Sequence, residues 1–214
     1  MPFPSDIYSE PEHSDDTLAN LGPLRGIAGV WEGKHGLDVP PKPLAPERQE
    51  YVERIELQPI DPQLNGPQIF YGLRYHTRIV KPGEIEMYHE QVGHWLWEPA
   101  TGTVIQTLSI PRGQAALAVG HSTSDAKRFE LTAKRGETVN GILSNPFIED
   151  AFHTLEFNIT VEILSADSWR YDEDTIIAIR GQAEPFHHTD HAILTRIAPP
   201  LPNPLALGRA GPDA

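Results

Sequence analysis

The strongest constraint on the fold is a period of two in the apolar residues, which recurs in many short segments. Residues 50–57 read Glu-Tyr-Val-Glu-Arg-Ile-Glu-Leu, so polar and apolar side chains roughly alternate, as on a half-buried strand. Residues 69–80 are rich in the aromatic and β-branched types that strands favour. Similar runs, several with turn residues at their ends, predict further strands over residues 84–98, 103–110, 115–119, 128–134, 153–164, 168–180 and 191–197.

Helical signals are scarce, which narrows the fold class further. Only residues 16–21, Asp-Thr-Leu-Ala-Asn-Leu, combine a capping residue with helix-compatible side chains, and Gly22 and Pro23 end the segment. One short helix followed by about eight to ten strands is typical of a β-sandwich or a closed barrel. A barrel removes the exposed strand edges, but the pattern alone does not separate the two architectures.

Proline marks the expected domain boundaries. The chain has 21 prolines, and many of them cluster within residues 40–46, 59–67 and 199–212. We expect a flexible arm over residues 1–16 and one ligand-binding domain over residues 17–198. Residues 199–214 lack periodicity, so we expect a Pro-rich disordered tail there.

Charge and composition exclude several classes of protein. The formal net charge of the 214 residues is −13, which would repel a phosphate backbone, so we expect no nucleic-acid partner. Cysteine is absent, which excludes disulfides, thiolate metal sites and Cys nucleophiles. The acidic N-terminal stretch is no secretory signal, and no run approaches the ~18 apolar residues of a membrane helix. We therefore expect a soluble cytoplasmic protein.

A glycine–tryptophan motif follows the predicted helix. Gly29, Trp31 and Gly33 form Gly-x-Trp-x-Gly, with a further glycine at position 36. This segment resembles the first strand of the nitrobindins, haem-binding relatives of the fatty-acid-binding barrels, although their third glycine comes one place earlier than Gly36. In such a barrel the Trp fills the closed end, and glycines permit close strand crossing.

Two later segments resemble the same family. Residues 89–93, His-Glu-Gln-Val-Gly, are followed by an aromatic pair, a turn and a β-branched strand in the family's order. Residues 185–194, Pro-Phe-His-His-Thr-Asp-His-Ala-Ile-Leu, are similar to the closing strand. The resemblance covers residues 18–198. It implies an all-β, closed antiparallel calycin-like β-barrel of about ten strands with one short N-terminal helical segment.

The resemblance also implies a haem b cofactor. The closing strand would carry the proximal iron ligand, and His89 would line the distal side. Without a gap, however, Thr189 occupies the position of the proximal histidine. His187 and His191 share the face of Thr189, whereas His188 points to the opposite face unless a bulge shifts the register. One of these three histidines is therefore the expected iron ligand.

Other residues have two interpretations each. Arg112, after a strand end, would pair with a haem propionate or lie in a surface turn. Trp31 is either a ligand platform or core. Glu173 and Asp174 face opposite ways on one strand and suggest a solvated rim. A non-haem metal site at residues 187–191 would need an additional histidine from a neighbouring strand, because residues 187 and 191 lie ~13 Å apart.

Two functions remain open. By its resemblance the chain is a nitrobindin-like haem protein that binds nitric oxide or isomerises peroxynitrite to nitrate, and hence a possible peroxynitrite isomerase. The alternative is a haem-free carrier or sensor of a small apolar or fatty-acid-like ligand. The offset at Thr189 favours the second function, and the histidines beside it favour the first. The sequence does not predict the oligomeric state.

Overall fold

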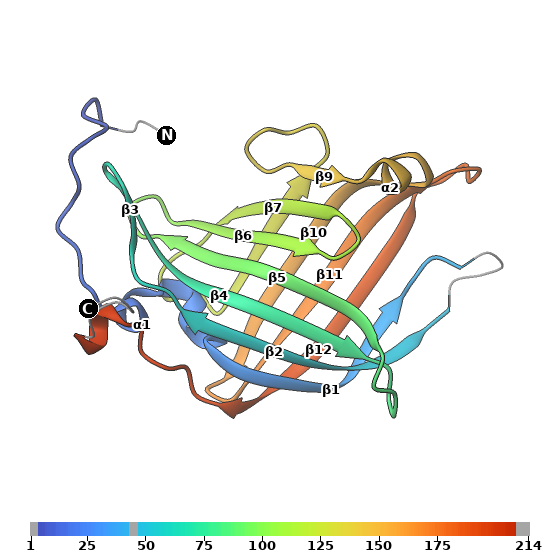
Figure 1. The fold of residues 1–214 in the computed structure, drawn as a ribbon, viewed down its shortest axis with the longest axis horizontal. Coiled ribbons are helices and arrows are strands. Elements are labelled where there is room, and N and C mark those ends of the chain that lie inside the picture. Colours follow the sequence, from blue (N-terminus) through green and yellow to red (C-terminus); the bar gives the residue numbers. More distant parts are fainter. Residues whose placement is uncertain (1–3, 43–46, 209–214) are drawn as a thin grey trace.

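The computed structural model describes residues 4–42 and 47–208 and contains a closed antiparallel barrel (Figure 1). In the described residues ten strands form its wall, which confirms the predicted all-β barrel. The wall strands are β1 (Gly29–Val39), β2 (Gln49–Pro59), β4 (Gln68–Val80), β5 (Met87–Glu98), β6 (Thr103–Ile110), β7 (Gln114–His121), β8 (Arg128–Lys134), β10 (Phe152–Ser165), β11 (Ser168–Ile179) and β12 (Phe186–Ala198).

Two pairings close the sheet into a barrel. Most strands pair with their neighbours along the chain, β1 pairs with β12, and β2 pairs with β4. The short strands β3 (Gln63–Asn65) and β9 (Ile142–Ser144) are added to β4 and β7. These two strands and the helix α2 (Pro146–Ala151) were not predicted, because each is too short to show a period.

The N-terminal helical segment closes one end of the barrel. Asp16 caps α1 (Thr17–Asn20) by accepting a hydrogen bond from the backbone N–H of Ala19, as the sequence predicts. The 3₁₀ helix η1 (Gly22–Ile27) follows and places Leu24 and Ile27 fully inside the barrel. Trp31 donates its Nε1–H to the Ile27 carbonyl at 2.7 Å. The helical segment and Trp31 therefore fill this closed end with buried apolar side chains.

A bulge in β1 explains the late third glycine. The pairing of β1 with β2 shifts between Gly33 and Gly36, where one extra residue bends the strand. A Cβ atom at Gly36 would overlap the ring of Tyr51, and one at Gly33 would lie 2.8 Å from Glu53 Oε1. Both glycines thus make room for side chains of β2 that lie across β1 inside the barrel.

The expected tail is partly ordered. Asn203 is fully buried, and its side chain accepts a hydrogen bond from the backbone N–H of Thr17 and donates one to Asp61 Oδ1. Residues 199–208 include η2 (Leu205–Leu207), and the Asn203 side chain fixes this segment to α1. Residues 209–214 lie outside the described residues. Of the arm, residues 4–16 run along the outside near β3 (Figure 1).

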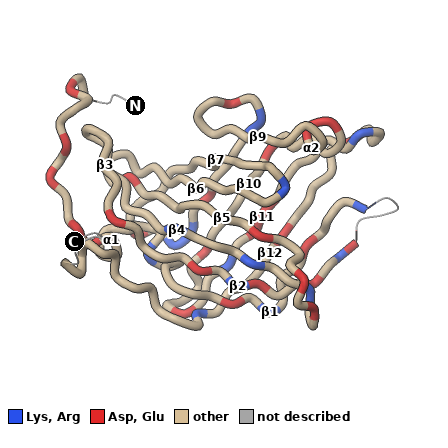
Figure 2. The backbone as a smooth tube through the Cα atoms, viewed as in Figure 1, with Lys and Arg blue, Asp and Glu red and all other residues tan. Residues whose placement is uncertain are grey.

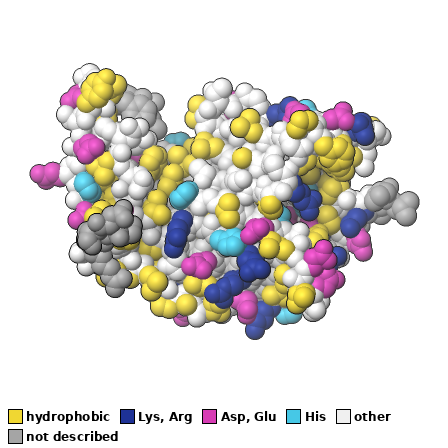
Figure 3. Space-filling view, viewed as in Figure 1, with side chains coloured by type: hydrophobic (Ala, Val, Ile, Leu, Met, Phe, Trp, Pro, Cys, Tyr) yellow, Lys and Arg dark blue, Asp and Glu magenta, His cyan; other side chains and the backbone are white. Residues whose placement is uncertain are grey.

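The outer surface carries its charge in a dispersed form. Aspartate and glutamate are distributed over the strands and the N-terminal arm (Figure 2). Figure 3 shows acidic, basic and histidine side chains mixed over one face, with hydrophobic side chains between them. Among the described residues no helix has the length and apolar character needed to cross a bilayer.

Candidate functional site

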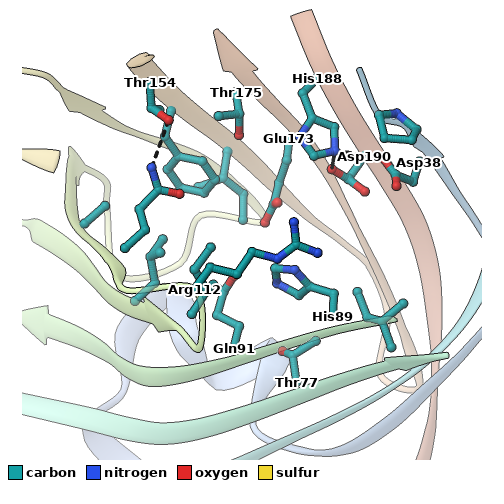
Figure 4. A pocket seen from close by; sticks show the side chains of 18 of the residues that line it. Asp38, Thr77, His89, Gln91, Arg112, Thr154, Glu173, Thr175, His188 and Asp190 are labelled. Atoms are coloured by element: carbon teal, nitrogen blue, oxygen red, sulfur yellow. Dashed lines mark hydrogen bonds and ion pairs between the residues drawn. The ribbon is translucent and has the colours of Figure 1, made fainter. Parts of the chain in front are cut away.

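The barrel contains a cavity of about 660 Å³, at the end opposite α1. Its lining includes ionisable side chains from different parts of the wall, among them Asp38, His89, Arg112, Glu173, His188 and Asp190 (Figure 4). The remaining wall is largely apolar, with Ile55, Ile79, Leu108, Ile110, Ile142 and Ile159. The lining therefore mixes aliphatic and ionisable side chains, as is usual for sites that orient an organic ligand.

His188 is the histidine of the closing strand that faces this cavity. Its Nε2 lies 2.7 Å from Asp38 Oδ1 and 3.5 Å from Asp190 Oδ2. Tyr88 donates its hydroxyl to the other oxygen of Asp38 at 2.5 Å. Burial alone would lower the pKa of His188, but the hydrogen bond to Asp38 and the charge of Asp190 outweigh it and raise that pKa.

Asp38, His188 and Asp190 form one compact group. Their ligand atoms lie within 4.8 Å of one another, so the three residues could also hold a metal ion. Burial raises the pKa of Asp190 to about 7, against the opposing effect of the His188 charge. The protonation states of these three side chains therefore depend on one another.

His89 approaches the cavity from the opposite wall. It extends from β5 toward the ligand space beside Arg112, and His188 lies across from it (Figure 4). Burial lowers the pKa of His89, so its imidazole is neutral at pH 7 and one ring nitrogen keeps a lone pair. Gln91 and Trp95 also line the cavity, so this face of β5 points inward with His89.

His187, Thr189 and His191 lie on the outer face of β12. The pairing of β11 with β12 runs without a shift, so side chains alternate and only residues 188 and 190 of this stretch point inward. His187 instead binds Asp174 on the outside, with Nδ1 2.8 Å from Oδ2. Thr189, at the ligand position of the ungapped match, therefore lies on the outer face with His187 and His191, and none of the three lines the cavity.

Arg112 and Trp31 have different positions. Arg112 follows β6 and reaches over the cavity near His89 (Figure 4), which fits the interpretation as a cationic group at the mouth. Trp31 is fully buried at the closed end and packs edge-on against Trp169, with ring centroids 6.1 Å apart. Trp169 lines the cavity and Trp31 does not, so Trp31 belongs to the core.

Carboxylates deep in the barrel were not predicted from the sequence. Glu173 faces inward and is the direct cross-strand neighbour of Asp190, whereas Asp174 faces outward. Glu53, on β2, accepts a hydrogen bond from the Tyr171 hydroxyl at 3.0 Å. Burial raises the pKa of Glu53 to about 8 and holds that of Glu173 well above its ordinary range. The alternation of β2 and β11 was the available signal, since it sets both residues inward.

Comparison with known proteins identifies the family of this chain. The model of the "THAP4-like, heme-binding beta-barrel domain" matches residues 20–196, most of the chain. The chain belongs to this nitrobindin family of haem-binding barrels. A solved structure, Rv2717c from M. tuberculosis, has a TM-score of 0.59 and 21% identity, over 84% of this chain and 96% of that one. That likeness supports the barrel fold. No curated protein matches at a significant level.

The side chains at the mouth of this barrel fit a haem group. A haem protein needs an imidazole to ligate iron and a polar or cationic surround for the propionates, next to apolar surface for the porphyrin ring. His188 and His89 supply imidazoles from two sides, Arg112 supplies the cation and the isoleucine wall supplies the apolar surface. The donor set of the cavity is thus compatible with the cofactor of its family.

Proposed function

We propose that the protein binds haem b in the barrel cavity, with His188 as the iron ligand. The observation that carries this proposal is the inward position of His188 on the closing strand, opposite the neutral His89. Membership of a haem-binding family supports it. The group at residues 187–191 has one cavity-facing histidine, so the choice among the three falls on His188.

Asp38 would orient the ligand imidazole. Histidines that bind metal commonly donate their other ring N–H to a carboxylate, which fixes the tautomer and increases the basicity of the ligand nitrogen. The 2.7 Å contact between His188 Nε2 and Asp38 Oδ1 provides this partner and would leave Nδ1 as the nitrogen available to iron. Tyr88 in turn holds Asp38 through its second oxygen. Arg112 would pair with a propionate at the mouth.

The activity that the family resemblance implies concerns nitrogen oxides. Bound haem would supply a redox-active iron that binds such small molecules. The chain's own contribution is the pocket around that ligand: His89, neutral at pH 7, offers a hydrogen-bonding nitrogen on the distal side. Isomerisation of peroxynitrite to nitrate rearranges the same atoms and needs no external electrons. The proposed activity therefore requires no site for an electron donor.

Titration of the purified protein with hemin tests the cofactor. We expect a shifted Soret band for the wild type and for His187→Ala, whose side chain is outside the barrel. In His188→Ala the affinity for hemin should fall at least about tenfold, and added imidazole should restore the spectrum. A wild type without a shifted band, or equal spectra for the two variants, contradicts the proposal.

The nitrogen-oxide activity needs its own measurement. Mixing the hemin-loaded protein with peroxynitrite should accelerate its decay and raise the yield of nitrate relative to nitrite. His89→Ala should change the rate while leaving the hemin affinity within about threefold, because this residue is assigned to the distal side. If the protein binds hemin but does not accelerate the decay of peroxynitrite, it is a haem carrier, and the proposed isomerase activity is wrong.

A haem-free carrier is the second candidate function, and the ionisable wall bears on it. A fatty acid would bring a further carboxylate next to Glu53, Glu173 and Asp190, which all line the cavity. Burial raises the pKa of each of these carboxyl groups, so the interior around them disfavours negative charge. A carboxylate ligand would therefore place its charged group at Arg112 and not beside Glu53 and Glu173.

A further inference from the structure

We propose that the haem-free barrel binds an organic cation, an alkylamine or similar ammonium compound, with its charged group at Glu173 and Glu53. The proposal rests on the cavity being a ligand site, as in the proposed function, and names the ligand class of the haem-free state. Glu173, Glu53 and Asp190 carry the argument, together with Gln106 on the opposite wall.

The first observation is the convergence of carboxyl groups inside the barrel. Glu173 on β11 and Asp190 on β12 are directly opposed cross-strand neighbours, and both line the cavity. Like charges at such positions destabilise a sheet unless a cation lies between them or protons neutralise them. In the described residues Glu173 forms no hydrogen bond or ion pair with another side chain, and it extends into the cavity (Figure 4). A ligand is the available partner.

The second observation is independent of the first. Glu53 and Gln106 line the same cavity from β2 and β6 and are 1% and 2% exposed. Each has one oxygen, Glu53 Oε1 and Gln106 Oε1, without a hydrogen-bond partner among the described residues. Buried polar atoms without a hydrogen-bond partner are rare and costly in folded proteins. An ammonium group carries three donors, so it can serve several such oxygens at once.

The surroundings suit the rest of such a molecule. Trp169 and Tyr171 pack side by side near Glu53, with centroids 6.0 Å apart, and both line the cavity. Aromatic faces attract ammonium groups. Isoleucines interspersed among the ionisable residues, such as Ile159, the direct cross-strand neighbour of Glu173, would contact an alkyl chain that extends from the charged group. The cavity thus offers acidic, aromatic and aliphatic surface to an amphiphilic amine.

Three probes of equal length separate the possible ligand types. We would titrate haem-free protein with n-octylamine, 1-octanol and sodium octanoate by isothermal titration calorimetry at neutral pH. The amine should bind at least about tenfold more tightly than the alcohol, as expected for charge-assisted hydrogen bonds in a buried site. Octanoate should bind more weakly than either.

Two variants assign the effect to the inner face. In Glu173→Gln, which keeps the shape but removes the charge, the affinity for octylamine should fall to that of octanol, while octanol binding stays within about twofold. Asp172→Asn is the matched control, because Asp172 precedes Glu173 on β11 and points to solvent. This control should bind all three probes as the wild type does.

Several outcomes would overturn the inference. Equal affinities for octylamine and octanol, tightest binding of octanoate, or an amine preference that survives Glu173→Gln would each contradict it. Failure here leaves the hemin titration unaffected, since that experiment reads the Soret band and depends on His188. Conversely, a protein that fails to bind hemin but prefers octylamine would retain the cation site and lose the haem proposal.

Discussion

The two ends of the barrel are built on opposite principles. At the closed end Leu24, Ile27, Trp31 and Leu194 are fully buried and fill the interior with apolar side chains. The open half buries carboxyl, imidazole and phenol groups instead, and burial shifts many of their pKa values. Apolar packing stabilises a fold, whereas buried ionisable groups cost free energy. The difference indicates that stability resides at the closed end and binding at the open half.

Removing the Trp31 side chain from the closed end should give the largest loss of stability. Trp31→Ala removes a fully buried indole with its hydrogen bond to Ile27 and should destabilise the protein by about 3–5 kcal/mol. Urea unfolding followed by circular dichroism measures it. At low urea the folded fraction should still bind hemin as the wild type does. A loss of hemin binding without a loss of stability would mean that the closed end serves binding and not stability.

The pH dependence of stability should come from the open half. A pKa of about 8 for Glu53, raised by burial, means that the folded state keeps a proton which the unfolded state loses above about pH 4.5. Stability from this group is therefore present below about pH 4.5 and decreases as pH rises toward 8, by a few kcal/mol at most. His188, whose pKa is also raised, acts in the same direction above pH 6.5, and His89 acts in the opposite direction.

Thermal melts at about pH 5 and 8 test this assignment. Glu53→Gln should reduce the fall in Tm between the two conditions, whereas Glu56→Gln, exposed on the same strand, should leave it unchanged. If both variants behave alike, the general charge of −13 and not the buried carboxyl controls the pH response.

A smaller effect should follow from filling the bulge in β1. In Gly36→Ala the new Cβ would overlap the Tyr51 ring, and overpacking of this kind costs about 1–3 kcal/mol. The same substitution in a Tyr51→Leu background should cost less, because the obstructing ring is gone. Additive costs in this double-mutant cycle would show that Gly36 acts through the backbone of β1 alone.

The smallest effect is expected outside the barrel. His187→Ala removes an exposed ion pair with Asp174, and such pairs contribute about 0.2–1 kcal/mol. Chemical denaturation should therefore barely distinguish this variant from the wild type. A large change would mean that this pair contributes more to stability than its exposed position on the outer face of β12 implies.

The sequence predicted most strands of the barrel but not which side chains of β11 and β12 line the cavity. Alternation is a local property, so the strands and the inward set of β5, with His89, followed directly from it. Alternation does not predict which face of β12 points inward. The ungapped match to the family aligns Thr189 with the iron ligand, whereas residues 188 and 190 face the cavity. The carboxyl group that meets Asp190 comes from another strand, Glu173, and only the register between β11 and β12 brings the two together.

One feature of the termini has a practical consequence. Asn203 fastens the C-terminal segment to α1, and the two ends of the described chain both lie on the closed-end side of the barrel (Figure 1). A fusion partner or a surface linker attached at either terminus would therefore extend away from the mouth. The barrel can be tethered to a sensor chip or joined to a reporter domain with its opening turned to solution.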